Sequence, residues 1–265
     1  MAQPIRSEYS IVGTGPAVFL THGVGARRHV WEGVVAKLAP HFQCISYDLR
    51  GHGGSEGATS PFGLDEFVAD LEALRAQLRI ERAHFIGHSL GGMIVPAYAR
   101  LHPERIRSLG LICTAAFRSP EARANSANFV KKIEAEGMPG ILDTMLSRWF
   151  TDEFRQERPD FVEQRKQQML NADPRVYLET YRVFATTETG PWLGEIAAPT
   201  LVTTGEFDPG CSPALNEKIA AALPQSELVI LPRLRHSVLV EAPDLVGNLL
   251  LRFLKSVEEP SEARA

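Results

Sequence analysis

The sequence predicts an α/β protein with a mostly parallel, twisted sheet that is flanked by helices. Three observations support this expectation: short apolar runs alternate with segments of helical periodicity, 44% of the residues are hydrophobic against 23% charged, and the chain has 265 residues. This composition is typical of a globular protein, and the length allows one large hydrophobic core. Strands that alternate with helices favour a parallel sheet, because each helix can connect two strands.

Six short apolar runs are the expected strands. They cover residues 17–21, 44–47, 83–86, 109–113, 200–204 and 228–231. Residues 31–38 and 64–78 carry apolar side chains at helical spacing, which predicts right-handed crossover helices between strands. The carboxyl ends of parallel strands meet at one edge of a sheet, and ligand-binding residues of such folds gather there.

The alternation is interrupted by a long segment rich in polar and aromatic residues. Serine or aspartate followed by proline is typical of a helix start and occurs at Ser119-Pro120 and Asp173-Pro174, while Pro159 marks another start. We therefore expect about four helices in this segment. The predicted organisation is an α/β core of residues 1–117 and 199–265, with a helical cap of residues 118–198 inserted after the sixth strand.

The most informative motif is Gly87-His88-Ser89-Leu90-Gly91-Gly92, which follows an expected strand and precedes a helix-like stretch. It matches the G-x-S-x-G nucleophile elbow, in which a serine occupies a strained turn between a strand and a helix. Glycines on both sides let the backbone pack closely, so that the serine Oγ stands clear of the sheet. This context leads us to predict that Ser89 is a nucleophile and not part of a purely structural turn.

A serine hydroxyl needs a base within hydrogen-bonding reach and an acid that orients this base. Asp208 and His236 follow the last two expected strands, so both are expected at the same edge of the sheet as Ser89. The chain order Ser89, Asp208, His236 is the one that serine hydrolases with this kind of sheet use. We predict these three residues as catalytic, with Glu206 as the only close competitor for the acid.

Hydrolysis through a serine also requires N–H donors for the carbonyl oxygen that becomes negatively charged. Leu90, directly after the nucleophile, offers one such donor at a helix N-terminus. The second is expected from the loop His22-Gly23-Val24-Gly25 after the first parallel strand, where we choose Val24.

Several kinds of site and partner are not expected. The eight histidines lack metal-binding spacing and no C-x-x-C occurs, so we predict neither a metal nor a cofactor. The three cysteines are widely spaced and favour no disulfide framework. A net charge of −4 gives no reason to expect nucleic acid or an anionic membrane as a partner. Without a signal-peptide or membrane-spanning stretch, we expect a cytoplasmic monomer or homo-oligomer that acts on a small molecule.

The motifs together resemble the α/β-hydrolase superfamily over nearly the whole chain. They are His22-Gly23, residues 48–55, the elbow around Ser89, Gly205-Glu206-Phe207-Asp208 and His236. Within the superfamily, residues 111–116 and 147–151 make the chain most similar to 3-oxoadipate enol-lactonases. This resemblance implies a serine hydrolase that cleaves a small ester or lactone through an acyl-enzyme. It also implies that the turn at residues 48–55 braces a neighbouring loop and does not contact the ligand. A carbon–carbon bond hydrolase, a general carboxylesterase and a small-ligand receptor on the same fold are the alternatives.

The expected cap supplies candidate substrate contacts. Trp149 is expected against the acyl portion of the substrate, because the aromatic residues of the cap suit a compact apolar pocket. The resemblance to enol-lactonases implies a substrate carboxylate, and a guanidinium group can bind a carboxylate through two parallel hydrogen bonds. Arg148 is our candidate for this contact, with Arg27 and Arg28 as alternatives.

Overall fold

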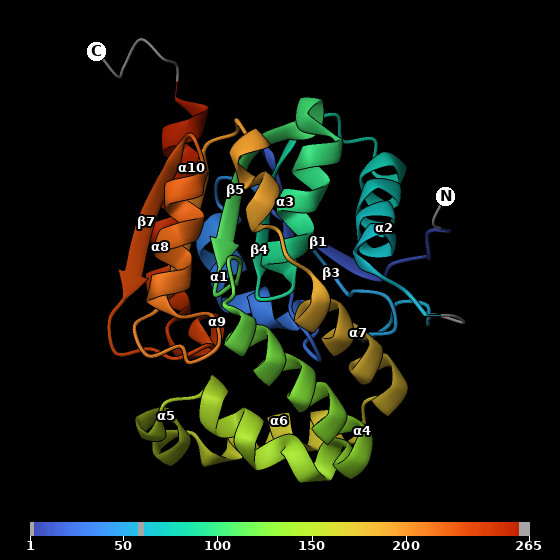
Figure 1. Ribbon diagram of the computed structural model, residues 1–265. Helices are drawn as coiled ribbons and strands as arrows, with labels where there is room; N and C mark the ends of the chain where they lie inside the picture. Colours follow the sequence, from blue (N-terminus) through green and yellow to red (C-terminus); the bar gives the residue numbers. More distant parts are fainter. Residues whose placement is uncertain (1–2, 58–60, 260–265) are drawn as a thin grey trace.

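A twisted sheet runs through the middle of the molecule (Figure 1). The computed structural model describes residues 3–57 and 61–259, and in these ranges the sheet has seven strands in the order β1-β3-β2-β4-β5-β6-β7. β1 pairs antiparallel with β3, and all other neighbouring strands are parallel. The expected fold class is thereby confirmed. The strands are β1 (Tyr9–Val12), β2 (Ala17–Thr21), β3 (Gln43–Tyr47), β4 (Ala83–His88), β5 (Ile106–Ile112), β6 (Thr200–Gly205) and β7 (Ser226–Leu231).

The six predicted strands are all present, because buried parallel strands form continuous apolar runs that the sequence displays. The additional strand is β1, which lies at the edge of the sheet and has only four residues. Its Ile11 and Val12 are 43% and 47% exposed, so it carries no buried apolar run. Pairing with β3 defines this strand, and a contact between distant segments is not visible in a local pattern.

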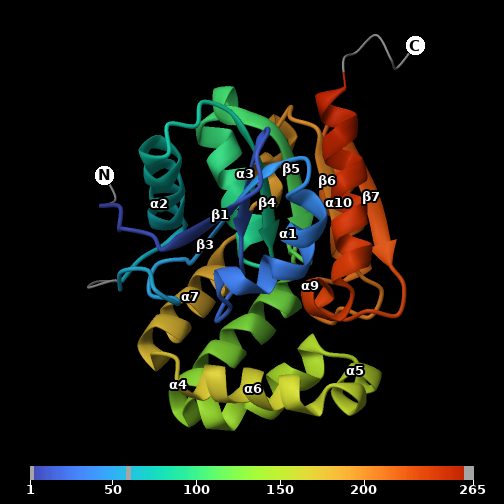
Figure 2. The same cartoon turned by 180° about the vertical axis from the view of Figure 1, so that it is seen from behind.

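Helices cover both faces of the sheet. α1 and α10 pack against each other on one face, and α2, α3 and α8 lie on the other (Figures 1 and 2). In α10, Val246, Leu250 and Phe253 recur every three or four residues and form the buried stripe that faces the sheet. The helices are α1 (Glu32–Leu38), α2 (Leu64–Gln77), α3 (Gly91–Leu101), α8 (Pro213–Ala222), α9 (Val238–Glu241) and α10 (Pro243–Glu258), with short 3₁₀ turns at Arg28–Trp31, Pro103–Arg105 and Gly190–Glu195.

Four further helices lie between β5 and β6 in the chain and beyond the carboxyl ends of the strands (Figure 1). Two begin at the predicted signals: Ser119 Oγ accepts the Ala122 N–H at 3.1 Å, and Asp173 Oδ1 accepts the Arg175 N–H at 2.8 Å. Pro159 starts a third helix, as expected. The four helices are α4 (Pro120–Trp149), which bends at Gly137, α5 (Asp152–Glu157), α6 (Pro159–Leu170) and α7 (Pro174–Thr186).

These inserted helices bury an apolar cluster of their own, in which Ile141, Phe150 and Tyr177 are at most 2% exposed. The expected place of the insertion after a sixth strand is wrong by one strand: it follows β5, because only β1 precedes β2 in the described residues. The division into a core and a cap stays a prediction, and residues 1–2, 58–60 and 260–265 of the predicted core lie outside the described residues. None of the helices in the described ranges is long and apolar enough to cross a membrane.

Candidate active site

The chain turns sharply at Ser89, between the end of β4 and the start of α3. Ser89 has a φ of +56°, a left-handed conformation that costs a residue with a side chain about 1–3 kcal/mol. Its N–H donates to the Ile112 carbonyl oxygen of the neighbouring strand at 2.8 Å, which holds the turn in place. A Cβ at Gly87 would lie 2.1 Å from the Gly91 oxygen, and a Cβ at Gly91 would lie 2.2 Å from the Thr21 oxygen. Both positions therefore require glycine, as the elbow motif predicts.

Asp208 and His236 meet at the carboxyl ends of β6 and β7. Asp208 Oδ2 and His236 Nδ1 are 2.6 Å apart. The second carboxylate oxygen, Oδ1, accepts the backbone N–H groups of Gly210 and Cys211 at 2.9 and 2.8 Å. Burial alone would raise the pKa of Asp208, but the charge and hydrogen bond of His236 and these two N–H donors hold it below its usual value. An ionised Asp208 keeps the proton of neutral His236 on Nδ1, which leaves Nε2 free to accept another.

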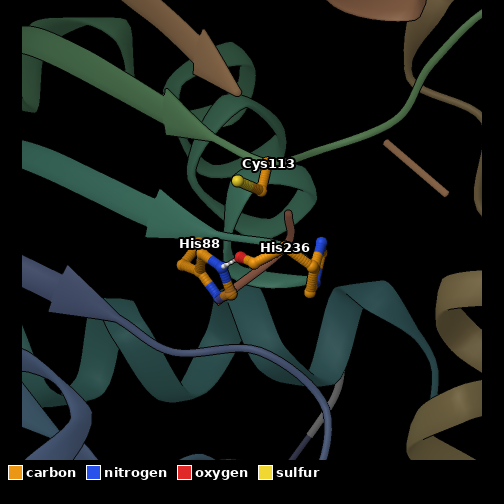
Figure 3. A group of neighbouring side chains, drawn as sticks. All are labelled: His88, Cys113 and His236. Atoms are coloured by element: carbon orange, nitrogen blue, oxygen red, sulfur yellow. Dashed lines mark hydrogen bonds between the residues drawn. The ribbon is translucent and has the colours of Figure 1, made fainter. Parts of the chain in front are cut away.

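Ser89, Asp208 and His236 all line one cavity of about 760 Å³ at this edge of the sheet. In the described part of the chain, Ser89 Oγ makes no hydrogen bond to the His236 ring. Hydrogen bonds between a nucleophile and its base often form only in the complex with substrate, so this does not argue against a catalytic pair. The loop that carries His236 is tied to β4, because the His88 Nε2–H donates to the His236 backbone oxygen at 3.0 Å (Figure 3). The structure therefore brings the three predicted catalytic residues to a common space.

Glu206, the alternative candidate for the catalytic acid, does not face the cavity. Its Oε2 accepts the Arg233 N–H at 2.8 Å in an exposed turn, and its side chain is not part of the cavity wall. Asp208, in contrast, is 3% exposed and bonded directly to the histidine. The geometry thus favours Asp208 as the acid.

The predicted oxyanion donors, Val24 and Leu90, belong to two segments of the chain, the loop after β2 and the turn after β4. Among the described residues, no hydrogen bond takes up the backbone N–H of Val24 or of Leu90. The loop with Val24 lies directly over the nucleophile, since a Cβ at Gly23 would approach Ser89 Cβ to 2.8 Å. Two N–H groups near one serine hydroxyl, both without an acceptor, are what an oxyanion hole requires.

Two buried histidines hold the loop that carries Val24. His22 Nε2 accepts the Leu49 N–H at 3.0 Å, and its Nδ1 lies 2.8 Å from the Gly23 oxygen. His52 Nε2 accepts the Gly25 N–H at 3.1 Å. Burial, together with the charge of His52, lowers the pKa of His22 to about 3, and burial also lowers the pKa of His52, so both rings are neutral acceptors at neutral pH. The turn at residues 48–55 therefore braces this loop through His52, a contact that the sequence did not specify.

The remaining cavity wall comes largely from the inserted helices. Trp149 and Arg148, the predicted substrate contacts, both line it, and the Arg148 guanidinium lies 6.0 Å from the centre of the Phe129 ring. Arg28 is instead engaged in an ion pair with the buried Asp48. Arg27, the other alternative, also lines the cavity, and a third arginine of the wall, Arg165, was missed. Helical spacing offers a signal for it, because Phe161, Gln164, Arg165 and Gln168 recur at intervals of three and four residues and all line the cavity.

Two groups of side chains bring three potential metal ligands together: His88, Cys113 and His236 (Figure 3), and Asp208, Cys211 and His236. Burial raises the pKa of both cysteine thiols, which favours the protonated form that binds metals poorly. His88 Nε2 and the Asp208 carboxylate already have hydrogen-bonding partners. These groups therefore fit a metal poorly, and the absence of a metal stays a prediction.

Comparison with known proteins decides the family. The family model described as alpha/beta hydrolase fold matches residues 16–243 of this chain. The chain belongs to the α/β-hydrolase family. It is 27% identical over 256 residues to 3-oxoadipate enol-lactonase 2 of Acinetobacter baylyi, an alignment that covers 96% of this chain and 95% of the relative.

Two solved structures of the α/β-hydrolase fold resemble the chain closely. One is the enol-lactonase from Burkholderia xenovorans LB400, with a TM-score of 0.87, 29% identity, and 95% of this chain and 97% of that protein covered. The other is a malate-bound thermophilic esterase from Thermogutta terrifontis, with a TM-score of 0.88, 29% identity, and 96% and 95% covered. The α/β-hydrolase fold and the resemblance to enol-lactonases, both expected from the sequence, are confirmed.

Proposed function

We propose that this α/β-hydrolase cleaves a small ester or lactone through an acyl-enzyme on Ser89. The observation that carries the proposal is the 2.6 Å contact between Asp208 and His236 in the cavity that Ser89 also lines. A strained serine, an oriented histidine and two backbone N–H groups without an acceptor are the parts that acyl transfer needs. Hydrolase relatives of nearly equal length support the reaction class.

In the proposed reaction, His236 Nε2 takes the proton of Ser89 while Oγ attacks the carbonyl carbon of the substrate. The Val24 and Leu90 N–H groups stabilise the resulting oxyanion. When the tetrahedral intermediate collapses, protonated His236 donates its proton to the leaving oxygen, and the acyl group stays on Ser89. A water that is deprotonated by His236 then attacks the acyl-enzyme and restores the free serine. In a lactone the leaving oxygen remains part of the acyl group, so the product is one hydroxy or keto acid.

The size and lining of the cavity support a small substrate. A volume of about 760 Å³ is in the usual range for sites that bind small molecules. Trp149 offers an apolar surface for the acyl portion, and Arg148 a positive charge near it. Similarity to two enol-lactonases supports a lactone, and similarity to an esterase supports an open-chain ester as the alternative.

A substrate panel tests the proposal. Purified protein is assayed with γ-butyrolactone, a carboxymethyl butenolide, short and long p-nitrophenyl esters and a vinylogous diketone. We expect turnover of the butenolide and of the short esters. Preference for long acyl chains without lactone turnover would indicate a general carboxylesterase, and turnover of the diketone alone a carbon–carbon bond hydrolase. A single, non-catalytic cycle with every compound would favour a receptor and refute the proposal.

A further inference from the structure

Arg165 of α6 is enclosed in the wall of the active-site cavity. Its Nη1 donates to the Gly25 carbonyl oxygen and to Gln168 Oε1, both at 2.9 Å. The guanidinium carbon lies 5.0 Å from the centre of the Trp149 ring, so an aromatic surface covers one face of the group. These three contacts fix the position and the plane of the guanidinium before any ligand binds.

No carboxylate neutralises Arg165 in the ranges that the structure describes. Four other arginines with largely buried side chains each face an acidic partner. These pairs are Arg28 with Asp48, Arg50 with Asp70, Arg75 with Glu72, and Arg118 with Glu188. Among the described residues, Arg148 of the same cavity wall shares with Arg165 the lack of an acidic partner. Burial lowers the pKa of Arg165 to about 10, which leaves the group positively charged at neutral pH. An enclosed charge without a counter-ion is unfavourable, and it is retained where a ligand supplies the missing charge.

The donors of Arg165 that remain free suit an anion. Its Nε and Nη2 groups donate to no residue in the described part of the chain, and the side chain lines the cavity. The Nε–H and Nη2–H donors point in parallel from one edge of the guanidinium and form the fork that binds the two oxygens of a carboxylate. Trp149 covers one face of the group, which leaves the in-plane approach that bidentate binding requires.

The charged residues of the whole cavity wall also favour an anionic ligand. Among the described residues its wall contains three arginines, Arg27, Arg148 and Arg165, but two acidic residues, Glu32 and Asp208. Asp208 is already bonded to His236 and to two backbone N–H groups. Burial is the main cause of the lowered pKa of His22, His52 and His88, and the positive charge of Arg165 adds to it, so this charge reaches the histidines next to the nucleophile and the Val24 loop.

We propose that Arg165 binds a carboxylate of the substrate and thereby makes the enzyme selective for small anionic esters or lactones. This inference rests on the proposed hydrolase function and names its substrate class. Gly25, whose carbonyl is bonded to Arg165, directly follows the oxyanion donor Val24. The bound carboxylate therefore lies close to the reacting carbonyl, so that only a few bonds separate the two groups in the substrate.

A structural role for Arg165 makes a different prediction. Its hydrogen bond to the Gly25 oxygen also supports the loop that carries Val24. If this were its only role, replacing Arg165 would lower kcat for all substrates alike. An anion-binding role instead raises KM for charged substrates and leaves neutral ones less affected. The ratio of kcat/KM values for a charged and a neutral substrate of equal shape separates the two roles.

The experiment uses the mono-p-nitrophenyl ester of glutarate and its methyl-capped diester, which lacks the free carboxylate. Both are assayed with wild type, Arg165→Gln, Arg165→Lys and Arg148→Gln. Lys166→Gln is the matched control, because it removes a positive charge from the next residue of the same helix, outside the cavity wall. We expect wild type to prefer the anionic ester, Arg165→Gln to lower this preference about 10- to 100-fold, mostly through KM, and Lys166→Gln to leave it unchanged. Arg165→Lys keeps a charge without the fork and should retain part of the preference.

Three outcomes would overturn the assignment. The preference could survive in Arg165→Gln, it could collapse in Arg148→Gln instead, or wild type could favour the neutral ester. In each of these cases the hydrolase function would stand, because esters are still cleaved. If wild type cleaved neither ester, the proposed function would fail, and titration of the protein with glutarate would still decide whether Arg165 binds an anion: wild type should bind it and Arg165→Gln should not.

Discussion

Replacing Asp208 with asparagine changes one group in the pair that orients His236. The carboxylate uses both oxygens: Oδ2 contacts His236 Nδ1, and Oδ1 accepts the Gly210 and Cys211 N–H groups. In the asparagine variant the amide oxygen has to remain opposite the two backbone donors, since turning the NH₂ group toward them would leave both without an acceptor, at about 1–3 kcal/mol each. The NH₂ group therefore faces His236 Nδ1.

An NH₂ group in that place donates to Nδ1 and moves the proton of neutral His236 to Nε2. This tautomer cannot accept the proton of Ser89. The corresponding substitution in serine proteases lowers kcat by about 10⁴, which corresponds to about 5.5 kcal/mol of transition-state free energy. We expect a loss of this order for Asp208→Asn in the hydrolysis of p-nitrophenyl acetate, with an unchanged far-ultraviolet circular dichroism spectrum.

Glu206→Gln is the control for this prediction, because Glu206 lies two residues away in the same turn. Among the described residues its side chain bonds to the Arg233 N–H alone, in an exposed position. We expect its kcat to stay within a few-fold of wild type. A loss of less than tenfold for Asp208→Asn, or an equal loss for Glu206→Gln, would refute the assignment of the acid and of the histidine tautomer.

The remaining predictions concern the nucleophile, the elbow and the response to pH. Ser89→Ala should lower kcat by several orders of magnitude in a folded protein, and residual activity above a tenth of wild type would argue against a serine nucleophile. Gly91→Ala places a Cβ 2.2 Å from the Thr21 oxygen, so urea unfolding should show a loss of about 1–3 kcal/mol, and full stability would contradict the close packing of the elbow. Burial lowers the pKa of His22, His84 and His88 to about 3, 4 and 3, whereas the unfolded chain takes up these protons near pH 6.5. Below that pH the native state thus binds fewer protons than the unfolded chain, so the free energy of unfolding should fall by about 4 kcal/mol between pH 7.5 and 5.5. A rise of this free energy on acidification would show that these rings are charged in the native state.

Local sequence patterns, such as apolar runs and the glycines of the elbow, determine the parts of the molecule that could be predicted. Parallel strands buried on both faces form continuous apolar runs, and the carboxyl ends of such strands share one edge of the sheet. Residues that follow different strands, such as Ser89, Asp208 and His236, can therefore be placed together without knowing the fold in detail. The elbow adds to this, because its glycines reflect close backbone contacts at fixed positions.

The parts that were missed depend on contacts between distant segments. β1 is defined by its pairing with β3. The bracing role of the turn at residues 48–55 was expected, but only the structure shows that His52 provides it, through its contact with Gly25. The role that we propose for Arg165 depends on the lack of a nearby carboxylate, which requires the positions of all charged groups around it. A sequence can place Arg165 on the inner face of a helix, but only the folded chain shows which partners surround it.

A rapid-quench experiment with p-nitrophenyl acetate detects an acyl-enzyme on Ser89. We expect a burst of nitrophenol with an amplitude near one per protein molecule, and a peptide containing Ser89 that gains the mass of one acetyl group. Quenching in acid should preserve this adduct for mass analysis, because acid stops the general-base step that removes it. A burst with the acetyl group on another residue, or steady turnover without any adduct on the Ser89 peptide after the acid quench, would show that Ser89 does not form the acyl-enzyme.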